Sequence, residues 1–168
     1  WNKNKSLPII DSLCNQAFDM KKIVQDHSSN NIAEICGLWV SNEASGMGIS
    51  KILIRAAVST LSKLSIGKSI AFASQYTIKT ISHMGYQIYS EIGDKGKFYY
   101  PTKDFESYVA LLNDTSKLEG SETREKRLIL ELQKNPSLIR LENEKEKNIL
   151  IQYDLRIIKK KANVFKMA

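Results

Sequence analysis

The sequence contains few cysteines and no long apolar run. Only 2 cysteines occur in 168 residues, and the spacing of Cys14 and Cys36 is not that of a CxxC motif. No apolar stretch approaches the roughly 20 residues that span a bilayer. We therefore expect neither disulfides nor a membrane span, no metal site, and a reducing, cytoplasmic setting. No signal peptide is recognisable, and because the chain opens on Trp1, we expect residues to precede it in a longer protein.

The length of the chain limits how many domains it can form, and its charge indicates which kinds of partner it can bind. At 168 residues and 42% hydrophobic composition, the chain is long enough for one domain and an appendage. The formal net charge of +7 favours an acidic partner, such as an anionic cofactor or an acidic carrier protein. Because basic and acidic residues are intermixed, we interpret the charges as a solvated surface, and we do not expect nucleic acid as a partner.

Two apolar strands joined by a helix predict an α/β fold. Residues 32–40 form an apolar run in which Glu34 is the only acid, a pattern typical of a central strand covered on both faces. Apolar residues follow at helical spacing over 49–64, and a second short strand is expected at 69–75. This order predicts parallel neighbouring strands joined by a right-handed crossover. Further helices are expected at 6–27, 76–86, 103–114 and 121–135, and a further strand at 86–93.

The composition of the chain changes near residue 115. Residues 1–115 carry the pattern of strands and helices, whereas residues 116–168 contain runs of charged residues with apolar residues at helical intervals. We expect a charged, helix-rich C-terminal extension that is interrupted at Pro136. Within it, apolar and polar side chains alternate over residues 148–158, which predicts a strand, with a helix as the alternative.

The loop between the first strand and the helix at 49–64 contains Gly46 and Gly48 and predicts an anion site. A loop that opens directly into a helix presents several backbone N–H groups at the positive end of the helix dipole. The position of Lys51 does not fit the GxxxxGK[ST] loop of nucleotide triphosphatases. It does not fit the GxGxxG fingerprint of dehydrogenases either, because that pattern needs a glycine there.

The segment EASGMG (43–48) resembles the pyrophosphate-binding loop of the GNAT acyltransferases, which has the pattern Gln/Arg-x-x-Gly-x-Gly/Ala. The turn HMGY (83–86) is similar to a later turn of that family. The segments AEICGLWVS (33–41) and YYPTKDFESYVALLND (99–114) look like the autoinducer-synthase-like and N-acyl amino acid synthase branch. The resemblance covers roughly residues 5–115. It implies a GNAT-like sheet with parallel central strands flanked by helices, whose first strands would precede this chain.

The resemblance also implies a reaction. The chain would move an acyl group from a phosphopantetheine thioester, on coenzyme A or on acyl carrier protein, to an amine acceptor. Glu34 would be the base that removes a proton from the amine through a water. Tyr76 or Ser74 would supply the acid for the leaving thiolate. Backbone amides near Cys36 and Gly37, where the sheet would splay, would polarise the thioester carbonyl, and amides of the glycine loop would hold the phosphate. The residues expected to bind the donor are Cys36, Gly37, Leu38, Ser45, Gly46, Met47, Gly48, Ile49 and Ser74.

Each of these residues also has a purely structural interpretation. Glu34 is otherwise a strand residue that faces a polar rim or an arginine, Cys36 a small core residue, and the glycine pair a tight turn. Glu43, an acid at the first position of the loop pattern, departs from the family. It motivates an alternative function, a catalytically inactive acyltransferase-like module that binds a protein or nucleic acid through its basic tail.

Overall fold

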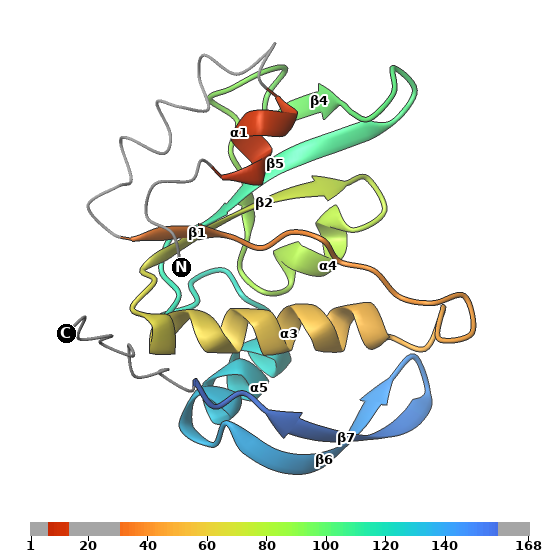
Figure 1. Cartoon of the computed structure of the whole chain (residues 1–168), viewed down its shortest axis with the longest axis vertical. Helices are drawn as coiled ribbons and strands as arrows, with labels where there is room; N and C mark the ends of the chain where they lie inside the picture. Colours follow the sequence, from red (N-terminus) through yellow and green to blue (C-terminus); the bar gives the residue numbers. More distant parts are fainter. Residues whose placement is uncertain (1–6, 14–30, 158–168) are drawn as a thin grey trace, which may run out of the picture.

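The computed structural model describes residues 7–13 and 31–157, which form a mixed α/β fold (Figure 1). The expected α/β class is confirmed at this level. Of the helix predicted at 6–27, the described residues contain the short α1, Pro8–Ser12. Residues 14–30, where the rest of that helix is predicted, lie outside the described residues.

The main sheet combines one parallel pair with antiparallel neighbours. Its strands are β1 Ile32–Glu34, β2 Lys68–Ser74, β3 Gln87–Ile88, β4 Lys97–Tyr99 and β5 Glu106–Leu112, in the order β1-β2-β5-β3, with β4 also paired to β5. The predicted parallel pairing of the first two strands is confirmed, because Glu34 lies opposite Ile70 in a parallel register. Every other pairing in this sheet is antiparallel. In the part of the chain that the structure describes, β1 lies at an edge of the sheet, so its predicted central position is not found.

The helix predicted at 103–114 is wrong, because most of this segment is the strand β5. It pairs with β2 on one side and with β3 and β4 on the other, so it lies in the interior of the sheet. Both faces of its second half are buried, from Val109 to Leu112. A strand covered on both faces has no apolar alternation, so its continuous apolar run matches helical spacing as well as strand spacing.

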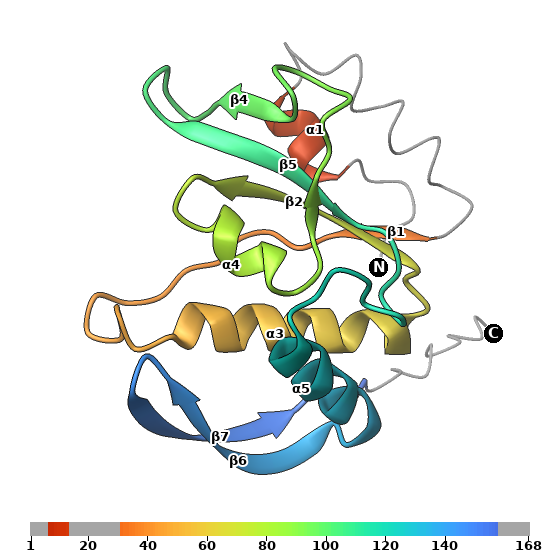
Figure 2. The same cartoon turned by 180° about the vertical axis from the view of Figure 1, so that it is seen from behind.

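Helices cover the two faces of the sheet unequally. On one face α1 and the residue that follows it contribute Ile9 and Leu13 to a core with β1, β2 and β5. On the other face lie α3, Ile49–Leu61, which continues as a 3-10 turn, and the short α4, Ile78–Ser82 (Figure 2). The predicted helices at 49–64 and 76–86 are therefore present, although the second is shorter than predicted.

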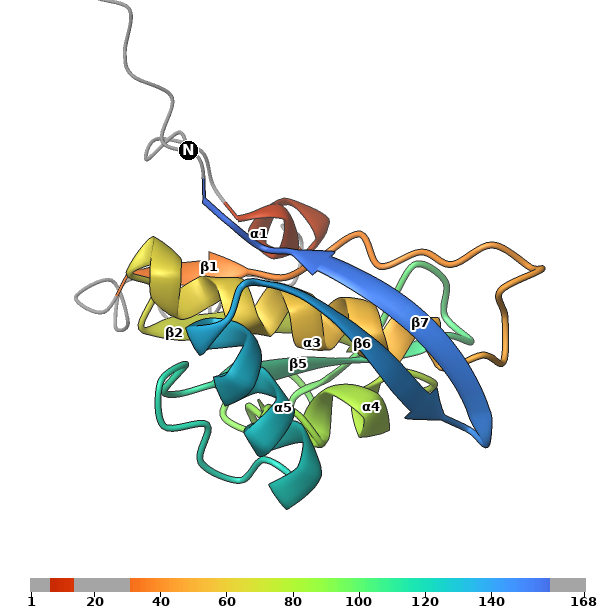
Figure 3. The same cartoon turned by 90° about the horizontal axis from the view of Figure 1, so that it is seen from below.

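The C-terminal extension forms a helix and a β-hairpin that pack on the outer side of α3 (Figure 3). The predicted helix is α5, Thr123–Lys134, and the predicted strand is β7, Lys147–Asp154. Its partner β6, Ser137–Glu144, corrects the expectation of a mainly helical extension. Pro136 ends the helical region, and the two residues between the strands, at 145 and 146, both have positive φ, as a tight hairpin turn requires.

A buried ion cluster joins the extension to α3. The guanidinium group of Arg55 is fully buried and donates to three carboxylates. Its Nε lies 2.7 Å from Glu125 Oε2, its Nη1 lies 2.8 Å from Glu142 Oε2, and its Nη2 lies 2.6 Å from Glu144 Oε1. The hydroxyl of Tyr153 also donates to Glu142, at 2.6 Å. Helix α3, helix α5 and the hairpin therefore share one network of charge-assisted hydrogen bonds.

Candidate functional site

The parallel strands β1 and β2 separate soon after they pair. Their ladder joins Ile32–Glu34 to residues 68–70, and one further bond runs from Ile35 N to Ile70 O at 3.0 Å. Beyond that point β2 continues to Ser74 in pairing with β5, whereas residues 36–40 leave the sheet. The separation falls beside Cys36 and Gly37, where the sequence predicts that the sheet splays.

A slot of about 300 Å³ opens where the strands separate. One wall is the departing chain after β1, another is β2 with the small side chains of Ala71 and Ala73, and α3 and α4 contribute Ile54 and Ile81. The lining is mainly apolar, and Ser74 and Thr77 add hydroxyl groups at the carboxyl end of β2, with their oxygens 3.1 Å apart. Small-molecule sites are commonly apolar clefts with a few polar groups, so the slot suits an apolar chain attached to a polar head.

Free backbone donors lie at the rim of this slot. In the described part of the chain, the N–H groups of residues 36–38 donate no hydrogen bond to any other residue, and these residues are exposed. Gly37 has φ +71°, and a Cβ there would meet nothing within 4 Å. Cys36 is an exposed free thiol at the rim, so its interpretation as a core residue is wrong. Partial burial and the neighbouring Glu34 raise the pKa of its thiol, which does not favour a nucleophilic thiolate.

Glu34 lies on the α1 side of the sheet rather than in the slot. Its carboxylate accepts the backbone N–H of Ile9 in the first turn of α1, at 2.9 Å. A carboxylate is favourable there because the first N–H groups of a helix have no partner within the helix. The group is only partly buried and lies close enough to Cys36 to affect the pKa of that thiol. Its predicted role as a base stays a prediction.

Tyr76 and Ser74, which are neighbours in sequence, occupy different environments. Ser74 lines the slot, whereas Tyr76 is 74% exposed and does not line it. The ring of Tyr76 packs edge-on against Phe105, with 5.9 Å between ring centroids. The structure therefore groups Ser74 with Cys36 and Leu38 but leaves Tyr76 outside that group.

Along the chain, the glycine loop follows the residues 36–38 that line the slot and precedes α3, and it consists of consecutive turns. Ser45 N donates to Asn42 O, and Met47 N donates to Ala44 O. Gly46 and Gly48 both have positive φ, and Gly48 directly precedes Ile49 at the start of α3. None of residues 45–49 lines the slot, so the predicted phosphate loop and the slot are adjacent along the chain but are separate surfaces.

The two glycines differ in their surroundings. A Cβ on Gly48 would lie 2.5 Å from Glu144 Cβ, whereas one on Gly46 would meet nothing within 4 Å. The close approach of the hairpin therefore accounts for Gly48 without any ligand. Gly46 keeps an open side, and a ligand has room to approach the backbone there.

We expect alanine substitutions to separate these two roles. Gly46→Ala should lower the free energy of unfolding by about 1–2 kcal/mol, because only the left-handed backbone is unfavourable for alanine. Gly48→Ala should cost a further 1–3 kcal/mol or so, since its Cβ also overpacks against the hairpin. Urea denaturation of the two variants measures the difference, and equal midpoints would contradict the close contact with Glu144.

Acidic side chains surround the start of α3. Lys51 Nζ lies 2.8 Å from Glu125 Oε1 and 3.8 Å from Glu144 Oε2. In the loop, hydrogen bonds from its own backbone N–H and from Ser41 lower the pKa of the exposed Glu43 carboxyl. The helix N-terminus therefore carries carboxylates beside its basic residues, and it is less attractive to a highly charged anion than the glycine loop alone suggests.

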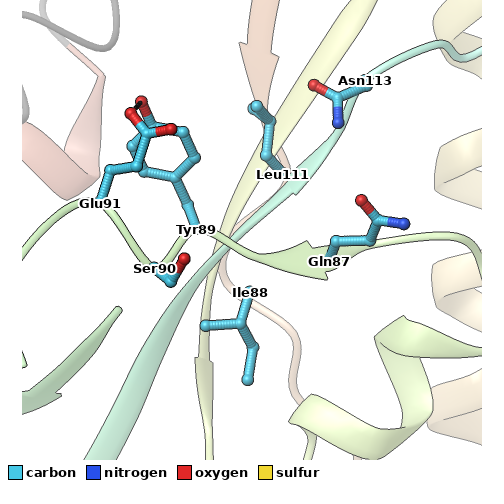
Figure 4. Close-up of a pocket in the computed structure, with 7 residues that line it drawn as sticks. All are labelled: Gln87, Ile88, Tyr89, Ser90, Glu91, Leu111 and Asn113. Carbon is cyan, nitrogen blue, oxygen red and sulfur yellow. Dashed lines mark hydrogen bonds between the residues drawn. The ribbon is translucent and has the colours of Figure 1, made fainter. Parts of the chain in front are cut away.

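A second, larger hollow of about 440 Å³ lies at the β3 edge of the sheet (Figure 4). Gln87, Tyr89 and Leu111 lie on one side of β3, and Ile88 points to the other. The hydroxyl of Tyr89 donates to Glu91 at 2.8 Å. None of the residues singled out in the sequence lines this hollow, and its lining is more polar than that of the slot.

Comparison with protein-family models, with curated proteins and with solved structures finds no match for this chain. Within residues 7–13 and 31–157, no helix is both long and apolar enough to cross a membrane. In the same residues no three His, Cys, Asp or Glu side chains gather in a way that would hold a metal ion.

Several residues of the slot were not identified from the sequence. Ala71 and Ala73 alternate with larger residues in β2, and small side chains on one face of a strand signal space above that face. The contributions of Ile54 and Tyr86 depend on how α3 and the α4 turn pack on the sheet, which no local pattern reveals.

Proposed function

We propose that the chain is an acyltransferase that moves an acyl group from a phosphopantetheine thioester to an amine. The observation that carries the proposal is the apolar slot at the point where two parallel strands separate. Backbone N–H groups at its rim donate no hydrogen bond within residues 7–13 and 31–157. The resemblance of the EASGMG loop (43–48) to the GNAT pyrophosphate loop supports the same assignment. The donor would be acyl coenzyme A or an acyl carrier protein.

The proposed reaction is a direct attack on the thioester. The neutral amine nitrogen attacks the carbonyl carbon, the carbon–sulfur bond breaks, and the thiolate leaves as an amide forms. The N–H groups of residues 36–38 would donate to the developing oxyanion, the kind of electrostatic stabilisation that often dominates acyl transfer. Glu34 would take the proton that the amine loses through a water, because its carboxylate does not line the slot. Ser74, which lines the slot, or Tyr76 would supply a proton to the thiolate. The acyl chain would lie in the slot. The phosphate would be held by the loop amides that donate no hydrogen bond within the described residues, those of Gly46, Gly48 and Ile49.

The alternative is a catalytically inactive acyltransferase-like module that binds a macromolecule. The acidic groups at the start of α3, Glu43, Glu125 and Glu144, favour it because they oppose the binding of a pyrophosphate. Exposed apolar side chains on the outer face of the hairpin, Ile139, Leu141 and Leu150, also favour it, because such a face suits a protein partner.

Blocking the slot separates the two functions. We expect Ala73→Leu to weaken the binding of octanoyl thioesters by about tenfold or more, because the added side chain occupies the space of the acyl chain near the mouth. Stability should change little, since leucine fills a space that is otherwise empty. Calorimetric titration with octanoyl coenzyme A measures the binding. If neither the parent protein nor the variant binds or transfers any acyl thioester, the inactive module becomes the better assignment.

A further inference from the structure

We infer that Tyr86 forms the inner end of the slot and limits the acyl group to short and medium chains. This inference rests on the proposed function, because it concerns the substrate of that same slot. It assigns a specificity-determining residue that lies outside the glycine loop and outside the strand of Glu34.

The position of Tyr86 follows from a buried side-chain hydrogen bond. Its hydroxyl lies 2.7 Å from Ser69 Oγ, and both residues are buried. Ser69, Ala71 and Ala73 lie on the same face of β2, since side chains alternate between faces along a strand. Along this face the slot runs inward from Ala73 past Ala71, and the ring that reaches Ser69 closes it.

The strands also close the inner end. At Ser69 the strands β1 and β2 are paired, with Ala33 opposite Ser69, so no gap between them continues beyond Tyr86. On the helix side the ring belongs to a core with Val58, Met84 and Leu112, all of which are almost completely buried. A longer acyl chain would therefore have to displace the ring from packed neighbours.

The volume of the slot determines how long an acyl chain it can hold. A group of the size of water or methylene occupies about 30 Å³, so roughly ten such groups fill the slot of about 300 Å³. Some of that space must hold the thiol end of the pantetheine arm. We therefore expect an octanoyl chain to fit and a dodecanoyl chain to exceed the slot.

A substitution at Ala71 tests the same limit on acyl chain length independently of Tyr86. It lies between the mouth and Tyr86 and lines the slot. A larger side chain there shortens the space without removing the buried hydrogen bond of Tyr86. Tyr86→Leu and Ala71→Leu should therefore shift the preferred chain length in opposite directions.

The experiment measures affinity by calorimetry with unreactive S-alkyl thioethers of coenzyme A that carry ethyl, octyl or dodecyl chains. For the parent protein we expect the octyl compound to bind about tenfold or more tightly than the dodecyl compound, since the surplus methylenes find no pocket. Tyr86→Leu should abolish this preference, and Ala71→Leu should transfer it to the ethyl compound. Tyr153→Leu is the matched control, because Tyr153 is also buried and hydrogen-bonded but lies on the far side of α3.

The outcomes distinguish the inference from the proposed function. If the parent protein binds the three thioethers with affinities that rise steadily with chain length, Tyr86 sets no limit and the inference is overturned while the proposed function stands. The same holds if the preference survives in Tyr86→Leu. If the parent protein binds none of the thioethers, whether coenzyme A or acyl carrier protein carries them, the proposed function itself fails. Should Tyr86→Leu not fold, the Ala71→Leu shift still decides the question.

Discussion

Replacing Arg55 with methionine should lower the free energy of unfolding by about 3–5 kcal/mol, the usual cost of removing one partner from a buried ion pair. The change leaves Glu125, Glu142 and Glu144 in the interior without the guanidinium that donates to all three. Their remaining cationic contacts come from partly exposed groups that are weaker partners in the interior. Urea denaturation followed by circular dichroism measures the loss.

Two further variants make the Arg55 result specific. Arg124→Met removes a guanidinium that is partly exposed, although it lies 3.1 Å from Glu144 Oε1, so it should cost less than about 1 kcal/mol. Arg55→Lys keeps the charge but loses the fork that reaches three carboxylates, so its stability should lie between those of the parent protein and Arg55→Met. Equal urea midpoints for Arg55→Met and the parent protein would show that the cluster adds nothing to stability.

The cluster should also give the folded state a dependence on pH. Burial alone would raise the pKa of Glu125, but hydrogen bonds from Arg55 and Lys51 outweigh it and hold the pKa below the ordinary value of 4.5. A lowered folded pKa means that this contribution is complete above the unfolded pKa and is lost as the pH falls through the folded one. Acid should therefore narrow the difference in stability between the parent protein and Arg55→Met.

Patterns within short segments predicted most of the helices and the parallel pair. The apolar strand at 32–40, the helix that follows Gly48 and the strand after it indicated a crossover, and β1 and β2 are parallel. The charged helix α5 and the alternating strand β7 were also recognisable, because their exposed faces give a clear period. The strand in the segment at 103–114 was not recognised, because a strand that is buried on both faces shows no alternation of apolar and polar residues.

Contacts between distant segments could not be predicted. From the sequence alone, Arg55 would be placed on the solvated face of an amphipathic helix. It is the centre of the ion cluster only because the fold brings residues 125, 142 and 144 close to it. Likewise, the sequence predicted that Gly48 helps to bind an anion. The structure gives another reason for a glycine at this position, because Glu144 of the hairpin leaves no room for a side chain. In the candidate site, the point of strand separation followed from the resemblance, but the inner end of the slot depends on the packing of Tyr86.

Replacing Glu34 with glutamine should lower the rate of acyl transfer by roughly 10²–10⁴-fold, the usual size of a lost general base. The shape of the site should persist, because the amide oxygen of glutamine still accepts the N–H of Ile9 that the carboxylate accepts now. Loss of the negative charge beside the first turn of α1 should cost no more than about 1 kcal/mol of stability. Affinity for the acyl donor should be unchanged, since Glu34 does not line the slot.

A pH series distinguishes a base from a residue that only holds α1 in place. If Glu34 removes the proton of the amine, raising the pH should partly restore the rate of Glu34→Gln, because more of the amine then arrives neutral. A merely structural role gives a rate deficit that does not change with pH. Glu106→Gln is the matched control, because Glu106 is also partly buried and accepts a hydrogen bond, from Tyr108 at 2.9 Å. A Glu34→Gln variant that acylates a panel of amines as fast as the parent protein would place the base elsewhere.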